Sequence, residues 1–216
     1  MKKQKKIWNK IIFIIGLLLV SYPLVSSIIE RQHQKDAVAT YQSSMEAEDK
    51  SRIQDAIAKA SEYNDMLFQT QGASIGDLQN GILSEENYEN LLNLSGTGVM
   101  GSIEIPKINV DIPIYHGTSE EVLASGVGHF QDSSLPVGGN NTRCILTGHR
   151  GLPNSKLFTR LDELEKEDLF FYKYVWGNLS IPHYRNRSHG TGGSGAAGDF
   201  TGKGFMHLNN LYPLWN

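Results

Sequence analysis

One cysteine and one histidine lie close together near the middle of the chain. In the stretch RCILTGHRG, Cys144 comes five residues before His149, and it is the only cysteine among 216 residues. A thiol becomes a nucleophile when it loses its proton, and a histidine can protonate the leaving group. Along a strand the two side chains lie beyond hydrogen-bond reach unless the following loop folds back. We therefore interpret Cys144 as a small buried core residue rather than as half of a local dyad.

His149 ends an apolar, strand-like run and stands between Gly148 and Arg150. Histidine titrates near neutral pH and can act as a general acid or base. Taken alone, His149 is either a loop residue that hydrogen-bonds to nearby backbone or one part of an active site completed elsewhere. The seven histidines and one cysteine show neither CxxC nor HExxH spacing, so the sequence predicts no metal and no other cofactor.

Composition limits the class of protein. A hydrophobic content of 39% is sufficient for the core of one or two domains. The net charge of -3 and the pI near 6.2 argue against a nucleic-acid-binding protein, which would carry a basic surface. A single cysteine excludes a disulfide within these residues.

Residues 1–30 predict a basic cytoplasmic tail and a membrane anchor. MKKQKKIWNK is followed by IIFIIGLLLVSYPLVSSII, a nearly uncharged run of the length that a spanning helix needs. Because the lysines hold the start of the chain in the cytoplasm, we expect a single-pass protein of the cell membrane with its main domain on the extracellular side. The alternative is a cleaved signal peptide, with Ser26 and Ser27 in its processing region.

Residues 31–98 predict helical structure and a linker. The segment from Glu30 to Phe68 has no Gly or Pro and is rich in helix-forming residues, which indicates a stalk or a helix packed on the main domain. The polar, glycine-containing segment from Gln69 to Gly98 indicates a linker or lid. A short helix is predicted within it, in LSEENYENLLNL.

Residues 99–174 predict the main domain. MGSIEIPKINVDIPIYHG alternates apolar and polar residues as two strands do, with prolines that indicate edges or bends. SEEVLASGVGHF indicates a short helix, TRCILTGHR a strand, and KLFTRLDELEKEDLFFYKYV an acidic helical turn followed by a strand. Many short strands with few helices predict a mainly β fold, a small barrel or sandwich.

The ordered motifs IPKI, GHF, SLPVGG, TGHRG and KLFT resemble the sortases, most closely the class C enzymes that polymerise pilins in Gram-positive bacteria. The resemblance covers about residues 99–172. It implies an eight-stranded barrel and a transpeptidase whose cysteine attacks the Thr-Gly bond of an LPxTG-like sorting signal, forming a thioester that an amine resolves. It also implies that His149 is the catalytic histidine, that the partners are pilins or surface proteins, and that nucleic acid is not a partner.

The sequence departs from that family in three places. It contains neither a cysteine motif like TLxTCTPYG nor an arginine motif like HRLxVRG, and residues 69–98 lack the proline of an Asp-Pro-aromatic lid. After LFFYKYV, glycine becomes abundant and the apolar periodicity ends. Reading HLNNLYPLWN one base later permits TLITCTPYG, which indicates that the reading frame changes between Tyr174 and Asn178.

The sequence as a whole predicts an incomplete sortase-like β-barrel preceded by a transmembrane helix and a helical stalk, with residues 175–216 as a disordered, out-of-frame tail. The expected function is that of a sortase transpeptidase whose catalysis is lost in this truncated chain, because the catalytic Cys and Arg are missing. The alternative is a non-catalytic, membrane-anchored protein of the cell envelope.

Overall fold

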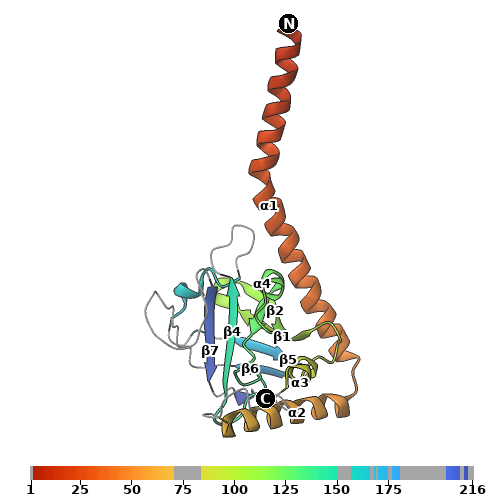
Figure 1. The fold of residues 1–216 in the computed structure, drawn as a ribbon, viewed down its shortest axis with the longest axis vertical. Helices are drawn as coiled ribbons and strands as arrows, with labels where there is room; N and C mark the ends of the chain where they lie inside the picture. Colours follow the sequence, from red (N-terminus) through yellow and green to blue (C-terminus); the bar gives the residue numbers. More distant parts are fainter. Residues whose placement is uncertain are drawn as a thin grey trace.

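The computed structural model describes residues 2–70, 84–149, 157–165, 168, 170–174, 177–180, 203–209 and 212–213. A long helix projects from a curled sheet, and a second helix crosses one end of that sheet (Figure 1). The helices are α1 (Lys2–Glu46), α2 (Lys50–Gln69), α3 (Glu85–Asn90) and α4 (Glu120–Ser125), with 3-10 turns η2 (Pro106–Ile108) and η3 (Leu161–Glu163). The strands are β1 (Val99–Ile105), β2 (Val110–His116), β3 (Val127–His129), β4 (Arg143–His149), β5 (Phe171–Tyr174), β6 (Gly177–Ser180), β7 (Lys203–Asn209) and β8 (Tyr212–Pro213).

The strands form one mixed sheet in the order β7-β4-β3-β2-β1-β5-β6-β8. β2 and β3 are parallel, joined by a crossover through α4, and the other neighbouring pairs are antiparallel. This arrangement confirms the mainly β fold with a helical N-terminus. The predicted strand pair in MGSIEIPKINVDIPIYHG is the antiparallel pair β1–β2, in which Ile103 lies opposite Ile112.

The core includes residues of β1 and β2, and β1 is buried along almost its whole length. Ile103, Ile105 and Ile114 are fully buried and contact one cluster with Phe158 and Tyr172. A Cβ at Gly101 would meet the Tyr172 Oη at 2.6 Å, so glycine is what lets this ring pack on β1. The hydroxyl of Tyr172 then donates to the Met100 carbonyl at 2.9 Å.

α1 is a single helix that begins in the basic tail and continues past the apolar run. Its large side chains from Ile7 to Ile29 are exposed, and the helix is long and apolar enough to cross a membrane. Its last turns pack on β1 and β2. The residue pattern from 30 to 68 predicts continuous helix, but the chain turns at residues 47–49, where the Asp49 carboxylate caps α2 by accepting from Ser51 N at 2.7 Å.

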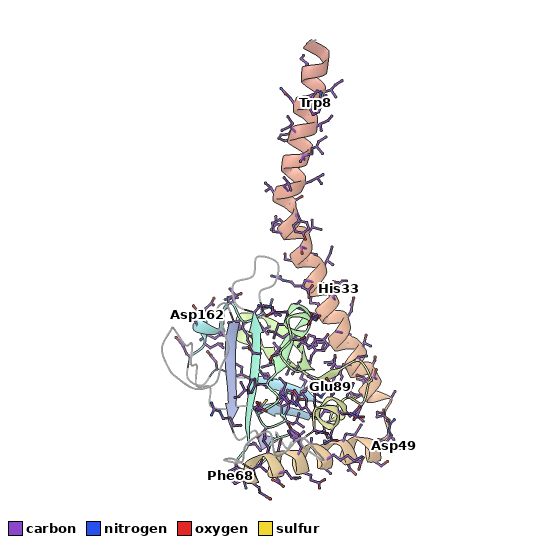
Figure 2. All side chains as sticks on the ribbon, viewed as in Figure 1. Trp8, His33, Asp49, Phe68, Glu89 and Asp162 are labelled. Atoms are coloured by element: carbon purple, nitrogen blue, oxygen red, sulfur yellow. The ribbon has the colours of Figure 1, made fainter. Side chains whose placement is uncertain are left out.

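α2 lies across the lower end of the sheet, between the labelled residues Asp49 and Phe68 (Figure 2). It is therefore a helix packed on the main domain, one of the two alternatives that its sequence allowed. Its buried side includes Ile53, Ala60, Tyr63 and Asn64. The Tyr63 hydroxyl donates to the Gln131 carbonyl at 3.0 Å, which fixes α2 against the loop between β3 and β4.

Among the described residues of the segment 175–216, for which the sequence predicts disorder, three short stretches form the strands β6, β7 and β8. β6 pairs with β5, β7 pairs with β4 along seven residues, and β8 pairs with β6. The physical reason for the difference is that the open edges of β4 and β5 offer backbone N–H and C=O groups that an extended segment of almost any sequence can satisfy. The rest of that segment lies outside the described residues.

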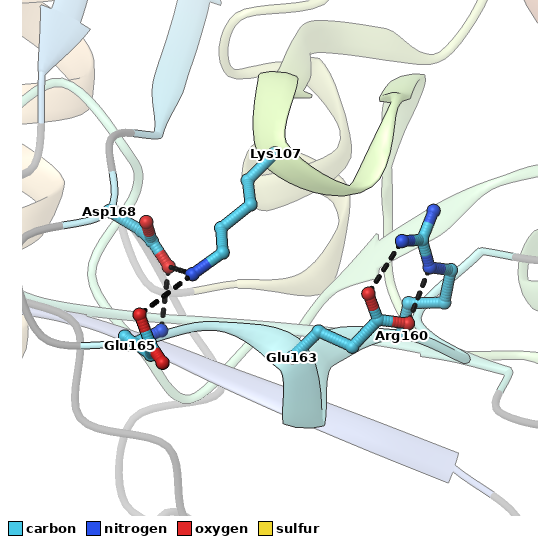
Figure 3. A network of polar contacts seen from close by, with 5 residues as sticks. All are labelled: Lys107, Arg160, Glu163, Glu165 and Asp168. Carbon is cyan, nitrogen blue, oxygen red and sulfur yellow. Dashed lines mark hydrogen bonds and ion pairs between the residues drawn. The ribbon is translucent and has the colours of Figure 1, made fainter.

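Ion pairs fasten the turns after β1 and around η3 (Figure 3). Lys107 Nζ lies 2.8 Å from Asp168 Oδ2 and 3.2 Å from Glu165 Oε2. Arg160 makes a two-pronged contact with Glu163. Because most of these groups are largely exposed, the pairs orient the loops more than they stabilise the fold.

Candidate active site

His149 is the last residue of β4, and its side chain is 15% exposed. Glu120, the first residue of α4, brings its carboxylate Oε2 to 3.7 Å from His149 Nε2, so the two form an ion pair when the imidazole is protonated. The hydroxyl of Ser119 caps α4 by accepting from Val122 N, which fixes the turn that carries Glu120. The site therefore holds a partly accessible imidazole beside a carboxylate, an arrangement that can give and take a proton.

The end of β4 is held in place by contacts with the core residue Phe158. His149 O accepts a hydrogen bond from Phe158 N at 3.2 Å, and a Cβ at Gly148 would meet the Phe158 ring at 3.1 Å. The glycine before the histidine in TGHRG thus lets a core phenylalanine pack directly under the strand. Packing of this kind holds the backbone at His149 in one position.

Cys144 lies in the core on the same strand and is 1% exposed. Burial raises the pKa of its thiol far above the ordinary value, so the reactive thiolate does not form at neutral pH. Residues five apart on a strand point to opposite faces, and at about 3.3 Å per residue their Cα atoms lie about 16 Å apart. The structure therefore supports the interpretation of Cys144 as a core residue and does not bring it to His149.

A second histidine, His129 in the motif GHF, is wholly buried on β3, opposite Leu146 of β4. The Tyr88 hydroxyl lies 2.9 Å from His129 Nδ1 and accepts from Gly117 N at 3.0 Å. His129 Nε2 faces the Ser134 carbonyl at 2.9 Å. Because a carbonyl only accepts, Nε2 carries the proton in the neutral ring and Nδ1 can only accept, so the single Tyr88 O–H is shared between Nδ1 and the His129 carbonyl, which lies 3.0 Å from it. Burial lowers the pKa of His129 to about 4, so this ring is neutral and structural at pH 7.

His116, opposite His129 on β2, joins the same polar cluster. Its Nε2 lies 2.6 Å from the Leu91 carbonyl and its Nδ1 lies 3.3 Å from the Gly98 carbonyl. Its ring meets Tyr88 edge to face, with centroids 5.1 Å apart. These contacts join the segment after α3 to the sheet. Desolvation lowers the pKa of His116. None of these contacts was predicted from the sequence; Tyr88, the one aromatic residue in the polar stretch EENYEN, could have been a signal.

Three arginines close to His149 in sequence do not complete the site in the described residues. Arg150 lies outside them, Arg143 begins β4 at the opposite end, and Arg160 pairs with Glu163. Within the described part of the chain, no three His, Cys, Asp or Glu side chains gather as metal ligands would. The described candidate site therefore consists of the His149 imidazole and its carboxylate neighbour, without a thiolate.

Comparisons with known proteins agree on one family. The sortase domain family matches residues 103–180. Sortase D of Bacillus subtilis is 46% identical over 68 residues, which are 32% of this chain and 31% of that protein. Sortase A of Listeria monocytogenes is 25% identical over 167 residues, which are 77% of this chain and 66% of that protein. The chain thus spans less than two thirds of the length of either relative.

The fold gives the same answer. A crystal structure of sortase C1 from Streptococcus agalactiae matches with a TM-score of 0.64 and 29% identity, covering 84% of this chain and 99% of that one. This chain belongs to the sortase family, whose members are cysteine transpeptidases, and its structural neighbours include class C sortases.

Proposed function

We propose that this chain carries the acid–base half of a sortase transpeptidase and lacks its nucleophile. The complete enzyme would join pilins or surface proteins through an LPxTG-like sorting signal by way of a cysteine thioester. His149 would protonate the leaving amine and deprotonate the incoming one, with Glu120 beside it. The observation that carries the proposal is the position of Cys144: the only cysteine of the chain is in the core, on the strand face that points away from His149.

Loss of catalysis follows from that position. A covalent mechanism needs a thiolate, and this thiolate must reach the substrate carbonyl. The raised pKa of Cys144 keeps its thiol protonated, and its 1% exposure keeps it out of contact with a substrate. His149 alone cannot form the thioester. We therefore expect these 216 residues to bind a sorting peptide at most, without cleaving it.

The missing nucleophile is explained by a change of reading frame between Tyr174 and Asn178. The family match ends at residue 180, close to that point, which supports the proposal. In the shifted frame the codons of HLNNLYPLWN permit TLITCTPYG, and those of TGKGFM permit QGKDLC in the same register. The last residues of the chain would then be a translated but unselected sequence that pairs with open strand edges.

Anchoring and partners belong to the same proposal. The exposed apolar surface of α1 would span the cell membrane, with the lysines of the tail in the cytoplasm and the sheet outside. The partners would be pilins or surface proteins that carry the sorting motif.

The second candidate is a non-catalytic, membrane-anchored envelope protein. The same observation favours it, because a sheet with a buried thiol and an intact anchor can bind a partner without any chemistry. Restoration of the frame separates the two: an enzyme relative regains activity, whereas a binding protein does not.

The test is a cleavage assay on a fluorogenic LPxTG peptide with the full chain in detergent micelles. The unrepaired chain should match a blank. Deleting one base, or adding two, near codon 176 should restore the cysteine motif and, if the downstream gene is intact, the cleavage activity. In the repaired protein His149→Ala should abolish cleavage, whereas Cys144→Ala should leave it in place. If the unrepaired chain cleaves the peptide and Cys144→Ala stops it, the proposal is wrong.

A further inference from the structure

α1 joins the apolar run to the sheet without a flexible segment. Its face bearing Gln34, Val38, Tyr41 and Met45 is buried, at the i, i+4, i+7, i+11 spacing of one helical side. Tyr41 and Met45 contact Val99, and the Tyr41 hydroxyl donates to the Met100 carbonyl at 3.2 Å, 59 residues away in sequence. The lower part of α1 is therefore a fixed part of the domain.

The distance along α1 from the apolar run to the domain is short. Ile29 is 50% exposed, and the first buried residue of the docked face, Gln34, comes five residues later. Five helical residues rise by about 7.5 Å. The polar headgroup layer on one side of a bilayer is about 5–8 Å thick, so the domain begins where the headgroups end. Pro23 lies within the apolar run, so any bend there leaves the stretch from Ile29 to the domain unchanged.

The end of the sheet that faces the apolar run is the end that carries the candidate site. The arrowhead of β4, whose last residue is His149, points toward the N-terminal end of α1, and α4 lies beside it (Figure 1). Asp162 of η3 lies at nearly the height of His33, whereas Phe68 at the end of α2 lies at the far end of the domain (Figure 2).

We propose that the end of the domain formed by α4, η3 and the last residue of β4 lies against the surface of the phospholipid bilayer in which α1 is anchored. This inference rests on the anchoring proposed above and goes beyond it, because an anchor with a flexible connection would leave the orientation free. The site would then open at the lipid–water boundary, and a substrate segment would have to be presented there.

The charged side chains of α4 and η3 do not hold this end at the membrane. Glu120 and Glu121 on α4 and Glu163 on η3 are exposed, and they would be repelled by an anionic surface. The rigid helix with its docked turns is the physical cause of the position. The orientation should therefore be the same in vesicles of pure phosphatidylcholine as in vesicles that contain phosphatidylglycerol.

The test uses the full chain in phosphatidylcholine vesicles with a Cys144→Ala background and a single fluorophore on an introduced cysteine. Asp162→Cys and Glu121→Cys place the fluorophore on the proposed membrane side, Phe68→Cys places it at the opposite end, and Leu19→Cys places it in the apolar run. Nitroxide on the lipid headgroup should quench the labels at 121 and 162 several-fold more than the label at 68. Nitroxide deep in the acyl chains should quench the label at 19.

Each other outcome contradicts the proposal in a distinguishable way. If the label at 19 is quenched but the labels at 68 and 162 respond equally, or 68 responds more, α1 is anchored and the orientation is wrong. If the label at 19 is not quenched, or the chain does not float with the vesicles, the anchoring itself is wrong and the orientation falls with it. Because the labels at 121 and 162 are independent, the orientation can still be tested if one of the two substitutions disturbs the fold.

Discussion

Asn64 on α2 and Leu135 in the SLPVGG motif hold each other by two hydrogen bonds. Asn64 Nδ2 donates to the Leu135 carbonyl at 3.0 Å, and Leu135 N donates to Asn64 Oδ1 at 2.7 Å. Both residues are buried. The Asn64 amide side chain supplies the donor and the acceptor that a neighbouring strand would otherwise offer to the Leu135 backbone. Together with the Tyr63 hydroxyl bound to the Gln131 carbonyl, this pair joins α2 to the loop between β3 and β4.

Replacing Asn64 by Ala should therefore destabilise the protein substantially. It leaves the buried N–H of Leu135 without its partner, whereas the Leu135 carbonyl still accepts from Val137 N at 2.9 Å; the unsatisfied N–H costs about 1–3 kcal/mol in the free energy of unfolding. Urea denaturation followed by circular dichroism of the full chain measures this change. Gln54→Ala, on the exposed side of the same helix, is the control and should be nearly neutral. Equal losses for the two variants would show that the pair contributes nothing.

Stability should fall with acid between pH 6.5 and pH 4 because of His129. The unfolded chain binds a proton at this ring below its ordinary pKa of 6.5, whereas in the folded chain the pKa is about 4. Between those two values the unfolded state binds more protons than the folded state. The contribution of the neutral, buried His129 ring to the free energy of unfolding is therefore fully present above pH 6.5 and is lost as the pH falls toward 4. Its size is about 3 kcal/mol. His116, whose pKa is also lowered, acts in the same direction.

The measurement is the urea midpoint as a function of pH for the parent and for His129→Gln. The variant should have lower stability at pH 7 and a flatter pH dependence from 6.5 to 4, with the remaining slope due to His116 and the carboxylates. Parallel curves for the two proteins would mean that His129 does not control acid sensitivity.

Cys144 should resist thiol reagents in the native protein. Its 1% exposure and raised pKa keep both access and thiolate concentration low. Mass spectrometry after iodoacetamide treatment should find negligible modification in buffer and complete modification in urea. A cysteine introduced at Glu121, which is exposed, serves as the positive control and should react in both conditions. Rapid native labelling of Cys144 would contradict its core assignment and reopen it as a nucleophile.

Removing β7 should promote self-association. β7 pairs with the outer edge of β4 from Arg143 to His149, and ending the chain after residue 202 leaves that edge open. Light scattering after size exclusion in detergent should show larger species for the shortened chain. A chain that ends after Pro213 keeps β7 and β8 and should behave as the full chain does. Unchanged mass in the first variant would mean that the pairing with β7 does not protect the sheet.

The sequence by itself determined the local elements and the family. Alternating isoleucines specified β1 and β2, Ser119 and Gly126 marked the ends of α4, and the uncharged run to Ile29 specified an apolar helix. These features are encoded within a few residues, because hydrophobic periodicity and capping act over one or two turns. The motifs from IPKI to KLFT likewise sufficed to identify a sortase and to single out His149.

Only the tertiary structure decided which distant residues meet. Tyr88 reaches His129 across 41 residues, Asn64 reaches Leu135 across 71, and Glu120 comes to His149 through a crossover. The contact of α1 with the sheet through Tyr41 and the pairing of β7 with β4 were likewise visible only in the tertiary structure. No local pattern encodes such pairs, because they depend on strand register and on how helices pack once the core has formed. Backbone pairing at an open edge depends least on side chains, which is why the sequence pattern of the tail did not reveal it.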